Sequence, residues 1–594
     1  MTPRQQVRIY AAFAAAATLS LVALVFSPVR SAGLVWDDRI FLHDGAWLRH
    51  GDAWIQFVLH GIPELGYYFR PLVVALFALE AHLFELDPAP MHMISLAMHL
   101  ANTLLVGILG RRLALAVNGR IDGEFLPCVA MLFFGLHPVL IEPVVWISIQ
   151  YDLLATFFVL SALWLNLAIG RIGVRAILVS VCFFFAACAK ESAASLPLLL
   201  LIMDWLRRCD GTAGSPVQMR AMRLWPVYAG VLLAGTLYLA MRYWALGFFV
   251  TDQTPFSLSR LHLACFTYLA YWKMLLWPMA DLAPIHVLPK GMFNHLGAVV
   301  AVCDFSAFAV LIAGSLLLAK RKPLGGLMVG VTAALLPVLN IVPIDFNESL
   351  YHERYLMMAI AVACVFLPTL LAGLGRGRLV LPVFTLGTVW LIVAVLNIRV
   401  TIPLWSDEVR LWQWALRIYP DSVLVRDNLL SAYLDRGDLV RARPLADSLM
   451  SDSLDCGYCM LNVAHLSILQ SEPQRAASAL QRAKTAMGTK RAPKRMILTY
   501  LLATGNLDRL QGHLDKAESA YRAAISIEPL DASAHMNLAV TLVRKGDIDD
   551  ARKELDDALS LYASDERTQR RKDFDRILAE RDPGLHRAAS DSTK

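Results

Sequence analysis

Long apolar segments alternate with short polar segments over the first 400 residues of the chain. The first of them, "IYAAFAAAATLSLVALVFSPV", extends for about 20 residues, the length that an α-helix needs to cross roughly 30 Å of hydrocarbon. It lacks a convincing small-residue cleavage site, so we interpret it as a retained spanning helix. The pattern predicts about eleven membrane helices, because further runs of spanning or near-spanning length follow at residues 92–116, 125–147, 153–169, 176–189, 193–206, 225–243, 298–319, 324–343, 355–374 and 379–399.

Two other apolar segments are better interpreted as helices that lie in or on the outer leaflet. The run in "YYFRPLVVALFALEAHLF", within the long loop 29–91, is short for a membrane span. The segment "LHLACFTYLAYWKMLLWPMADLAP", within the loop 245–295, is rich in Trp and Tyr, as interfacial segments tend to be. A full crossing by the second segment would also break the alternation of the basic loops that follow it.

Lysine and arginine residues form short clusters that fall at alternate turns between the apolar runs. Cytoplasmic loops hold the excess of positive charge, so this alternation predicts a cytoplasmic N-terminus. The polar residues of the remaining loops then lie on the outer side. The clusters are Arg4 and Arg8; Arg111, Arg112 and Arg120; Arg171 and Arg175; Arg207, Arg208, Arg220 and Arg223; Lys320 to Lys322; and Arg376 and Arg378.

Composition agrees with a protein that is mostly embedded in a membrane. Hydrophobic residues make up 57% of the chain and the mean hydropathy is +0.51, whereas soluble domains have about 45–50% apolar residues. The net charge of +6 is small for 594 residues and is dispersed among the loops. This distribution favours a lipid bilayer, and no nucleic acid, as the partner.

Past Asn397 the apolar runs end, the charge density rises, and a repeat of 34 residues begins. Small residues recur where paired helices would touch and large ones where they would fill a stack, which is typical of a tetratricopeptide α-solenoid. A generic amphipathic bundle is the disfavoured alternative. With eleven spans and a cytoplasmic N-terminus, the repeats are expected outside the cytoplasm. Corresponding positions are Gly512/Gly546, Ala517/Ala551, Tyr521/Leu555, Ala524/Ala558, Ala442/Ala476, Ala446/Leu480 and Leu449/Ala483.

Of the nine cysteines, two stand out in "DCGYC", because Cys456 and Cys459 belong to the repeat region. Their spacing permits a disulfide in an oxidising compartment. No strand–helix pattern of a redox domain surrounds them. A structural disulfide, or two unpaired thiols at a helix start, is therefore favoured over an oxidoreductase site.

Candidate chemistry is concentrated in the outer loops. Asp37 and Asp38 are adjacent carboxylates, and like charge with partial desolvation raises proton affinity in a way that suits a general base. Each candidate has a bland alternative: Arg70 could snorkel, His137 could bond a carbonyl next to Pro138, and Lys190 with Glu191 could be a structural ion pair. Ionisable residues near lipid are nevertheless costly unless paired or functional. The other candidates at the same predicted depth are Glu142, Asp152, Glu353 and Arg354.

The order of these motifs resembles the transmembrane-and-tetratricopeptide O-mannosyltransferases and their bacterial relatives, which are GT-C glycosyltransferases. The resemblance rests on "WDDRIF", "YYFRPLVV", "FGLHPVLIEPVVWISIQYD", "AKESAASLP" and "NESLYHERYLMM", followed by repeats, and covers nearly the whole chain. It implies an inverting transfer of a sugar from a polyprenyl-phosphate donor to an acceptor hydroxyl on the outer membrane face, with Ser or Thr of proteins as the favoured acceptor. For a bacterial relative it implies an inner-membrane protein with periplasmic repeats.

In that superfamily an acidic residue of the first outer loop is the catalytic base, which the resemblance places at Asp37, with Asp38 as its orienting partner. Arg70, Lys190 and Arg354 are the cations available to the departing lipid phosphate, and His137, Glu142, Asp152, Glu191 and Glu353 complete the expected substrate site. Some relatives use a divalent metal such as Mg²⁺ or Mn²⁺ and others do not. No dense ligand cluster occurs here, so we assign no metal site.

The resulting organisation is an all-α polytopic membrane protein. It comprises a GT-C-type membrane domain at 1–400, a junction at 401–420, repeats at 421–565 and a polar tail at 566–594. The repeats are expected to bind a protein acceptor, although about four units offer less concave surface than the longer arrays of the eukaryotic enzymes. Two alternatives remain open: the same chemistry on a glycan or glycolipid acceptor, and a non-enzymatic membrane-anchored scaffold.

Overall fold

The computed structural model describes residues 2–43, 46–48, 51–61, 68–119, 123–207, 217–249, 257–280, 282–287, 297–339, 341, 349–373, 380–452, 456–488, 492–562 and 564–581. Within these residues the protein is all-α, as predicted, and the one β pairing is an antiparallel bridge between Val287 and Ser349. Several predicted features lie outside them: the basic residues Arg120, Arg208, Arg376 and Arg378, parts of both long outer loops, and residues 582–594 of the polar tail.

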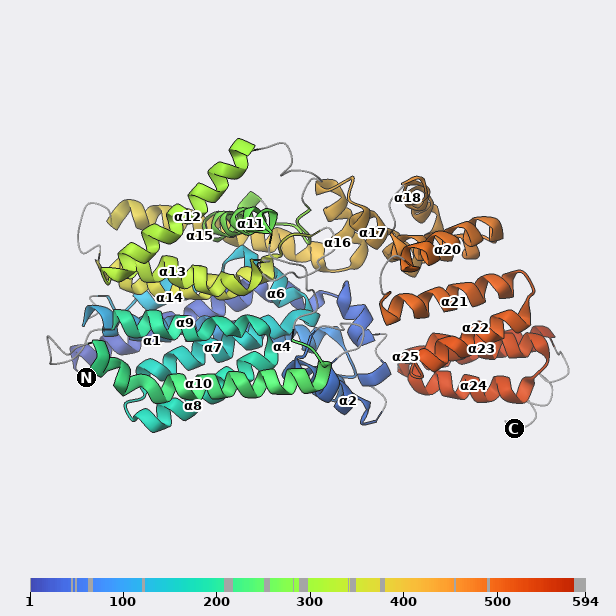
Figure 1. Cartoon of the computed structure of the whole chain (residues 1–594), viewed down its shortest axis with the longest axis horizontal. Helices are drawn as coiled ribbons and strands as arrows, with labels where there is room; N and C mark the ends of the chain where they lie inside the picture. The colour runs from blue at the N-terminus through green and yellow to red at the C-terminus, as the bar shows by residue number, and fades with distance from the viewer. Residues whose placement is uncertain are drawn as a thin grey trace.

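The membrane region is a bundle of long helices (Figure 1). Its α-helices are α1 (Pro3–Phe26), α2 (Ala53–His60), α3 (Pro71–Phe84), α4 (Pro88–Asn118), α5 (Leu126–Gly135), α6 (Ile141–Val145), α7 (Gln150–Ala168), α8 (Ile172–Ala189), α9 (Leu196–Leu206), α10 (Val217–Leu246), α11 (Leu258–Leu276), α12 (Gly297–Ala319), α13 (Pro323–Leu335), α14 (Met357–Gly373) and α15 (Val380–Thr401).

Eight helices of the described residues are long and apolar enough to cross a membrane, and a ninth crossing is obtained if α5 and α6 count as one span bent by 54°. The bend lies at Pro138, and proline both removes a backbone donor and clashes with the preceding turn. The length and composition of the helices therefore support eight or nine membrane spans, and not the predicted number of about eleven. The two additional predicted spans correspond to α9 and α13, which are shorter.

α9 illustrates why the counts differ. Its 11 residues rise only about 16 Å, roughly half of the hydrocarbon thickness. The 3₁₀ turn η7 (Glu191–Ser195) precedes α9 and follows α8. Together, η7 and α9 extend from the end of α8 to the C-terminal ends of α7 and α12. There Asp204 accepts hydrogen bonds from Asn166 and Tyr228, at 3.0 and 2.8 Å, and the Trp205 indole donates to the Leu318 carbonyl at 2.9 Å.

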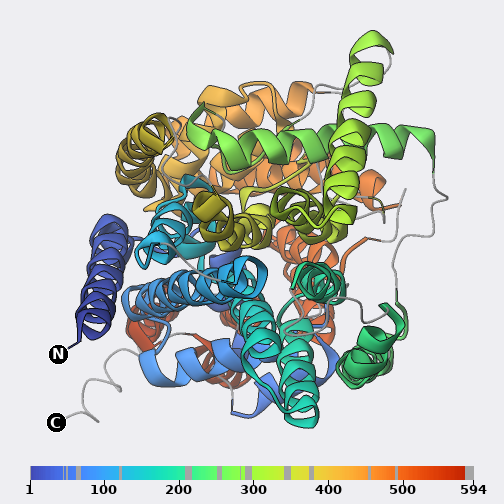
Figure 2. The same ribbon diagram turned by 90° about the vertical axis from the view of Figure 1, so that its left-hand side faces the viewer.

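The two segments expected at the membrane surface are helical and do not qualify as spans. α3 has 14 residues, too few to cross the hydrocarbon. α11 has 19 residues but is not among the candidate spans, and it lies across the direction of the long helices when Figures 1 and 2 are compared. Both observations are in keeping with an interfacial position.

The repeats follow a short junction made of the 3₁₀ turn η11 (Ile402–Trp405) and α16 (Glu408–Ile418). They form helix pairs that stack on one another, closed by a last helix. The pairs are α17 (Val423–Asp435) with α18 (Leu439–Ser451), α19 (Gly457–Leu469) with α20 (Pro473–Gly488), α21 (Lys494–Leu510) with α22 (Leu514–Ile527), and α23 (Ala532–Lys545) with α24 (Ile548–Leu561); α25 (Ser564–Arg581) completes the array.

The repeat positions pack as their spacing predicts. Ala517 and Ala551 are fully buried at helix contacts, and Tyr521 fills the space between helices. A Cβ on Gly505 would come within 2.6 Å of the Tyr521 ring, so only glycine permits this close approach. Residues 566–581, predicted as the start of a polar tail, belong to α25, whose Phe574 is buried against α23 and α24.

The repeats lie at the end of the bundle opposite to the N-terminus (Figure 1). A chain that starts on one side and ends on the other crosses the membrane an odd number of times. This arrangement favours nine crossings, with α5 and α6 as one span, over eight.

We therefore predict that the N-terminus and the repeats are exposed on opposite sides of the membrane. Epitope tags placed before Thr2 and after Lys594 should be reached by a membrane-impermeant protease from opposite faces of sealed vesicles. Exposure of both tags on the same face would mean an even number of crossings.

Candidate active site

The segment "WDD" is held in place by two tryptophans from distant parts of the chain, which pack on its own Trp36. Trp36 has a φ of 54°, a left-handed conformation that is costly for a bulky residue and persists only where surrounding contacts impose it. Its ring stacks on Trp146 at 4.5 Å between centroids, and it meets the edge of Trp412, from α16, at 4.8 Å. The backbone N–H of Trp36 donates to the Glu408 carboxylate at 3.1 Å. These contacts fix the direction of the two aspartates that follow.

Asp38 is fully buried and its two oxygens are already in use. It accepts the Ser148 N–H at 2.6 Å and the Val35 N–H at 3.3 Å. Burial raises its pKa to about 7, although the hydrogen bonds from Ser148 lower it. Asp38 thus joins the first outer loop to the 3₁₀ turn η6 (Ile147–Ile149).

Asp37 is half-buried, and within the described residues its carboxylate receives no hydrogen bond. Burial raises its pKa to about 6, whereas the charges of Arg354 and Arg495 lower it. Arg495 belongs to α21, so the electrostatic environment of this carboxylate includes the repeats. A half-exposed carboxylate with a raised pKa is able to accept a proton near neutral pH.

Arg354 and Glu142 form a buried ion pair beside the loop. The Arg354 N–H of the backbone also donates to Glu142, at 2.9 Å, and the guanidinium lies over the rings of Trp146 and Tyr355, at 4.9 and 4.8 Å. Its Nε is buried and has no hydrogen-bond acceptor among the residues that the structure describes. A buried donor that lacks an acceptor is costly, and an anionic oxygen would satisfy it.

Lys190 and Asp152 form a second buried ion pair. The Lys190 ammonium also lies 5.1 Å from the Tyr151 ring centroid and 4.6 Å from that of Tyr355. Burial lowers the pKa of Lys190 to about 8, against the raising effect of Asp152, so the side chain remains mostly cationic at neutral pH. One Asp152 oxygen is buried without a donor.

Arg70 forms a third pair with Glu191, at 2.9 Å, and Arg242 approaches the other Glu191 oxygen at 3.2 Å. The Arg70 guanidinium is held between the rings of Tyr68 and Tyr151, each 4.1 Å away. Flat guanidinium groups stack favourably on aromatic faces.

Shared aromatic rings connect these pairs into one cluster. Tyr151 lies against both Arg70 and Lys190, Tyr355 against both Lys190 and Arg354, and Trp146 joins Arg354 to Trp36. The structure thus brings together eight of the sequence-derived candidates: Asp37, Asp38, Arg70, Glu142, Asp152, Lys190, Glu191 and Arg354. The sequence analysis left the aromatic residues out of the site, and only the Trp and Tyr beside acidic motifs, as in "WDD" and "QYD", signal them.

The other two candidates, His137 and Glu353, have different surroundings. The His137 Nε2 lies 3.1 Å from the Leu275 carbonyl, and its ring packs on Trp390. Glu353 accepts the Ala283 N–H at 2.7 Å and lies 3.7 Å from the His286 ring. These contacts fix α11 and the segment 282–287 to the bundle, so the two residues support the surroundings of the cluster.

The first outer loop is also attached to the repeats. Arg39 forms ion pairs with Glu408 at 3.1 Å and with Asp435, on α17, at 2.7 Å. The Gly33 N–H donates to the Ser406 carbonyl at 3.0 Å. In addition, Leu530 of the repeats packs against the apolar cluster of α2 and α3. The repeats are therefore packed directly against the loop that carries Asp37.

In the described part of the chain, two groups of three His, Cys, Asp or Glu side chains have potential donor atoms within 4.8 Å of one another, and both lie in the repeats. They are Asp427 with Cys456 and Cys459, and His535 with Glu554 and Asp557. Neither group contains a residue of the membrane cluster.

Comparison with known proteins identifies the C-terminal region. Residues 502–566 match the tetratricopeptide repeat family. A solved structure described as the crystal structure of MamA protein is 22% identical, over 27% of this chain and 83% of that chain, with a TM-score of 0.21. No curated protein matches the chain. The chain therefore consists of a helical region with eight or nine candidate membrane spans followed by a tetratricopeptide region.

Proposed function

We propose that the protein is an inverting glycosyltransferase that moves a sugar from a polyprenyl-phosphate donor to a hydroxyl acceptor, most simply Ser or Thr of a protein. The observation that carries the proposal is the combination of an accessible carboxylate, Asp37, with the buried cation cluster of Arg354, Lys190 and Arg70. The order of motifs shared with the GT-C enzymes supplies the reaction class.

The proposed reaction begins with Asp37 as general base. A hydroxyl group is a poor nucleophile until a positioned carboxylate accepts its proton. The hydroxyl oxygen then attacks the anomeric carbon from the face opposite to the phosphate, the bond to the phosphate oxygen breaks, and the configuration inverts. Asp38 acts by holding the loop, because its carboxylate is already occupied by backbone N–H groups.

The lipid phosphate leaves with increased negative charge, which fixed cations stabilise strongly in a site of low dielectric constant. Arg354 is the best-placed cation, because its Nε has no acceptor and its charge acts on Asp37. Lys190 and Arg70 extend the positive surface along Tyr355 and Tyr151. Aromatic faces of this kind also suit contact with a sugar ring or a prenyl chain.

The proposed topology has the N-terminus in the cytoplasm and the repeats in the periplasm of a bacterial inner membrane. It rests on the basic clusters at alternate turns. We further propose that α9 and α13 also cross the membrane as short helices, which gives eleven crossings in total. The site residues lie where α1 and α8 end and where α7 and α14 begin, which places them near the repeats and on the proposed outer face.

Replacing Asp37 with Asn tests the base. Asn keeps the size of the side chain but accepts no proton, so transfer should fall by at least about 100-fold. Asp38→Asn should reduce transfer less and mainly disturb the loop. Transfer is measured by mass spectrometry of envelope proteins and glycans from cells that express each variant, with equal amounts of inserted protein as the control. Normal transfer by both variants would remove the catalytic role of this loop.

The pH dependence provides a second test. Only the deprotonated form of Asp37 accepts a proton, and its pKa is about 6. Activity should therefore be maintained above that pH and fall about tenfold per unit below it. The quantity to measure is kcat/KM for a soluble acceptor between pH 4.5 and 8. A plateau that continued down to about pH 4.5, close to where unperturbed carboxyl groups titrate, would contradict the assignment.

Removing the repeats tests whether the acceptor is a protein that the repeats bind or a smaller molecule that does not need them. A chain cut after Pro420 keeps α16 and the tryptophan contacts, so hydrolysis of the lipid-linked sugar should persist while transfer to the full acceptor is greatly reduced, mainly through its KM.

The matched control for this truncation is Asp435→Asn in the full chain, which removes the ion pair with Arg39 and keeps the repeats. If the truncated protein glycosylated its full acceptor as well as the intact chain does, the repeats would not recruit it. If hydrolysis were lost in the truncated protein but kept in Asp435→Asn, the repeats would form part of the active-site architecture.

A further inference from the structure

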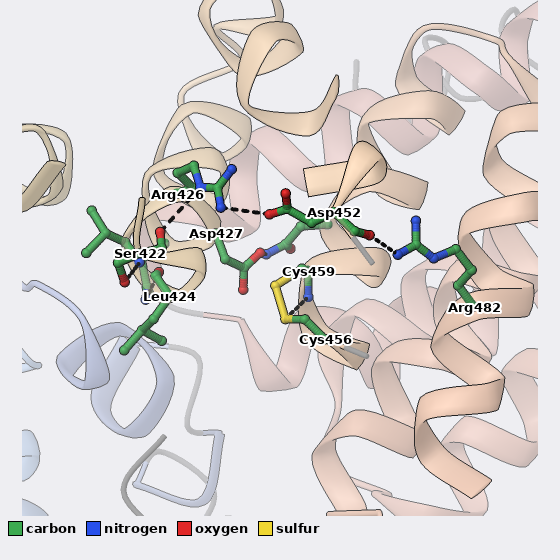
Figure 3. Close-up of a disulfide and its surroundings, with 11 residues drawn as sticks. Ser422, Leu424, Arg426, Asp427, Asp452, Cys456, Cys459 and Arg482 are labelled. Atoms are coloured by element: carbon green, nitrogen blue, oxygen red, sulfur yellow. Dashed lines mark hydrogen bonds and ion pairs between the residues drawn. A yellow bond between two sulfur atoms is a disulfide. The ribbon is translucent and has the colours of Figure 1, made fainter. Parts of the chain in front are cut away.

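A disulfide joins Cys456 and Cys459 at the N-terminus of α19, with a Cα–Cα distance of 5.3 Å (Figure 3). Cys456 is the N-cap residue, and its sulfur accepts the Cys459 N–H at 3.2 Å. The two sulfurs differ in environment, because Cys459 is 1% exposed whereas Cys456 is half-buried. An incoming thiol therefore has better access to Cys456.

A third group, the Asp427 carboxylate, lies beside the two sulfurs. One of its oxygens and both sulfurs are all within 4.8 Å of one another. Asp427 comes from α17, is 9% exposed, and accepts the amide of Asn462, on α19, at 2.8 Å. The neighbouring charges do not bind it: Arg426 pairs with Asp452, and Arg482 donates to the carbonyls of Met450 and Asp452.

A structural role explains this arrangement poorly. A cross-link stabilises a fold mainly by shortening the loops available to the unfolded chain, and its effect grows with loop length. This one encloses only Gly457 and Tyr458. The contacts of α19 with α17 and α20 already hold the helix in place, and a stabilising disulfide has no use for a buried carboxylate next to its sulfurs.

We propose that Cys456, Cys459 and Asp427 form a thiol–disulfide exchange site that acts on dithiol compounds or dithiol proteins. The thiolate of the dithiol attacks Sγ of Cys456, a new S–S bond forms, and the bond between Cys456 and Cys459 breaks. The electron pair of the broken bond leaves on Cys459, and Asp427 supplies the proton that neutralises it. The second thiol of the dithiol then attacks the mixed disulfide and releases Cys456 as a thiolate.

The two steps balance: the dithiol is oxidised to its disulfide, and the protein disulfide is reduced to two cysteines. The N-terminus of α19 favours the thiolate on Cys456, because helix N-termini stabilise negative charge and lower thiol pKa values. In the reverse direction Asp427 accepts the proton of Cys459, which allows that residue to close the disulfide again. The site lies outside the membrane cluster and does not depend on the glycosyltransferase proposal.

The test uses the full chain in lipid nanodiscs, oxidised and exposed to dithiothreitol at pH 7. The reaction is stopped with acid, thiols are alkylated, and the Cys456 and Cys459 peptides are quantified by mass spectrometry. We expect reduction at least about 10-fold faster than that of oxidised glutathione, and at least about 5-fold slower reduction in Asp427→Asn. Asp447→Asn is the matched control, because it removes an exposed carboxylate from the same repeat.

A trapping experiment identifies the attacked sulfur without altering Asp427. With 5,5′-dithiobis(2-nitrobenzoate), Cys459→Ser should form a stable mixed disulfide at Cys456. Cys456→Ser should form one at least about 10-fold more slowly at the buried Cys459.

The proposal would be overturned by reduction no faster than that of oxidised glutathione, by equal rates in Asp427→Asn and Asp447→Asn, or by preferential labelling of Cys459. It would equally be overturned if the reduced protein retained Zn²⁺ and could not be reoxidised, because the three residues would then be a metal site.

Discussion

The stacking of Trp36 on Trp146, closed at the edge by Trp412, is the contact on which the arrangement of the site depends. Three segments that are far apart in the sequence meet there: the first outer loop, the turn between α6 and α7, and the junction helix α16. The left-handed backbone of Trp36 is stable only while this contact exists. Asp37 and Asp38 owe their different roles to it, since the turn directs Asp38 toward backbone donors and leaves Asp37 accessible.

The three buried cations around this contact share one arrangement, in which each is paired with a carboxylate and also lies over an aromatic ring. An isolated charge near the hydrocarbon is expensive, and an ion pair removes most of that cost. The side chains of Arg354, Lys190 and Arg70 are all largely buried in these pairs. Their aromatic covers hold the cations in fixed positions, so that little reorganisation is needed when an anion binds.

The sequence predicted the elements well where the signal is local. Apolar runs located the long helices, and small residues such as Ala517 and Ala551 located the helix contacts of the repeats. Eight of the residues predicted at one membrane depth also lie together in the structure. The span predicted at residues 193–206 corresponds to α9, whose 11 helical residues are fewer than length and composition require of a membrane span. The helix α25 was missed because only Phe574 and a few neighbours give it an apolar face.

What the sequence could not predict were contacts between distant segments and the directions of adjacent side chains. Nothing near Trp36 indicates that Trp412 will cover it. Glu353 and Arg354 are neighbours, but in the 3₁₀ turn η10 (Glu353–Leu356) successive side chains diverge by about 120°. Arg354 therefore joins the cluster, whereas Glu353 holds the segment 282–287. The proximity of Asp427 to the disulfide was equally hidden, because Asp427 lies 29 residues before Cys456 and approaches it only when α17 packs on α19.

The attachment of the repeats to the first outer loop has a geometric consequence. Arg39 ties the loop to both α16 and α17, and Gly33 is hydrogen-bonded to the junction. The repeats therefore cannot swing freely like a tethered arm, and the distance from Asp37 to any point on their surface is nearly constant. For a long substrate held by that surface, the array would act as a ruler: it would select the hydroxyl at a set number of residues from the bound segment, so that spacing along the substrate, rather than local sequence, would define the modified position.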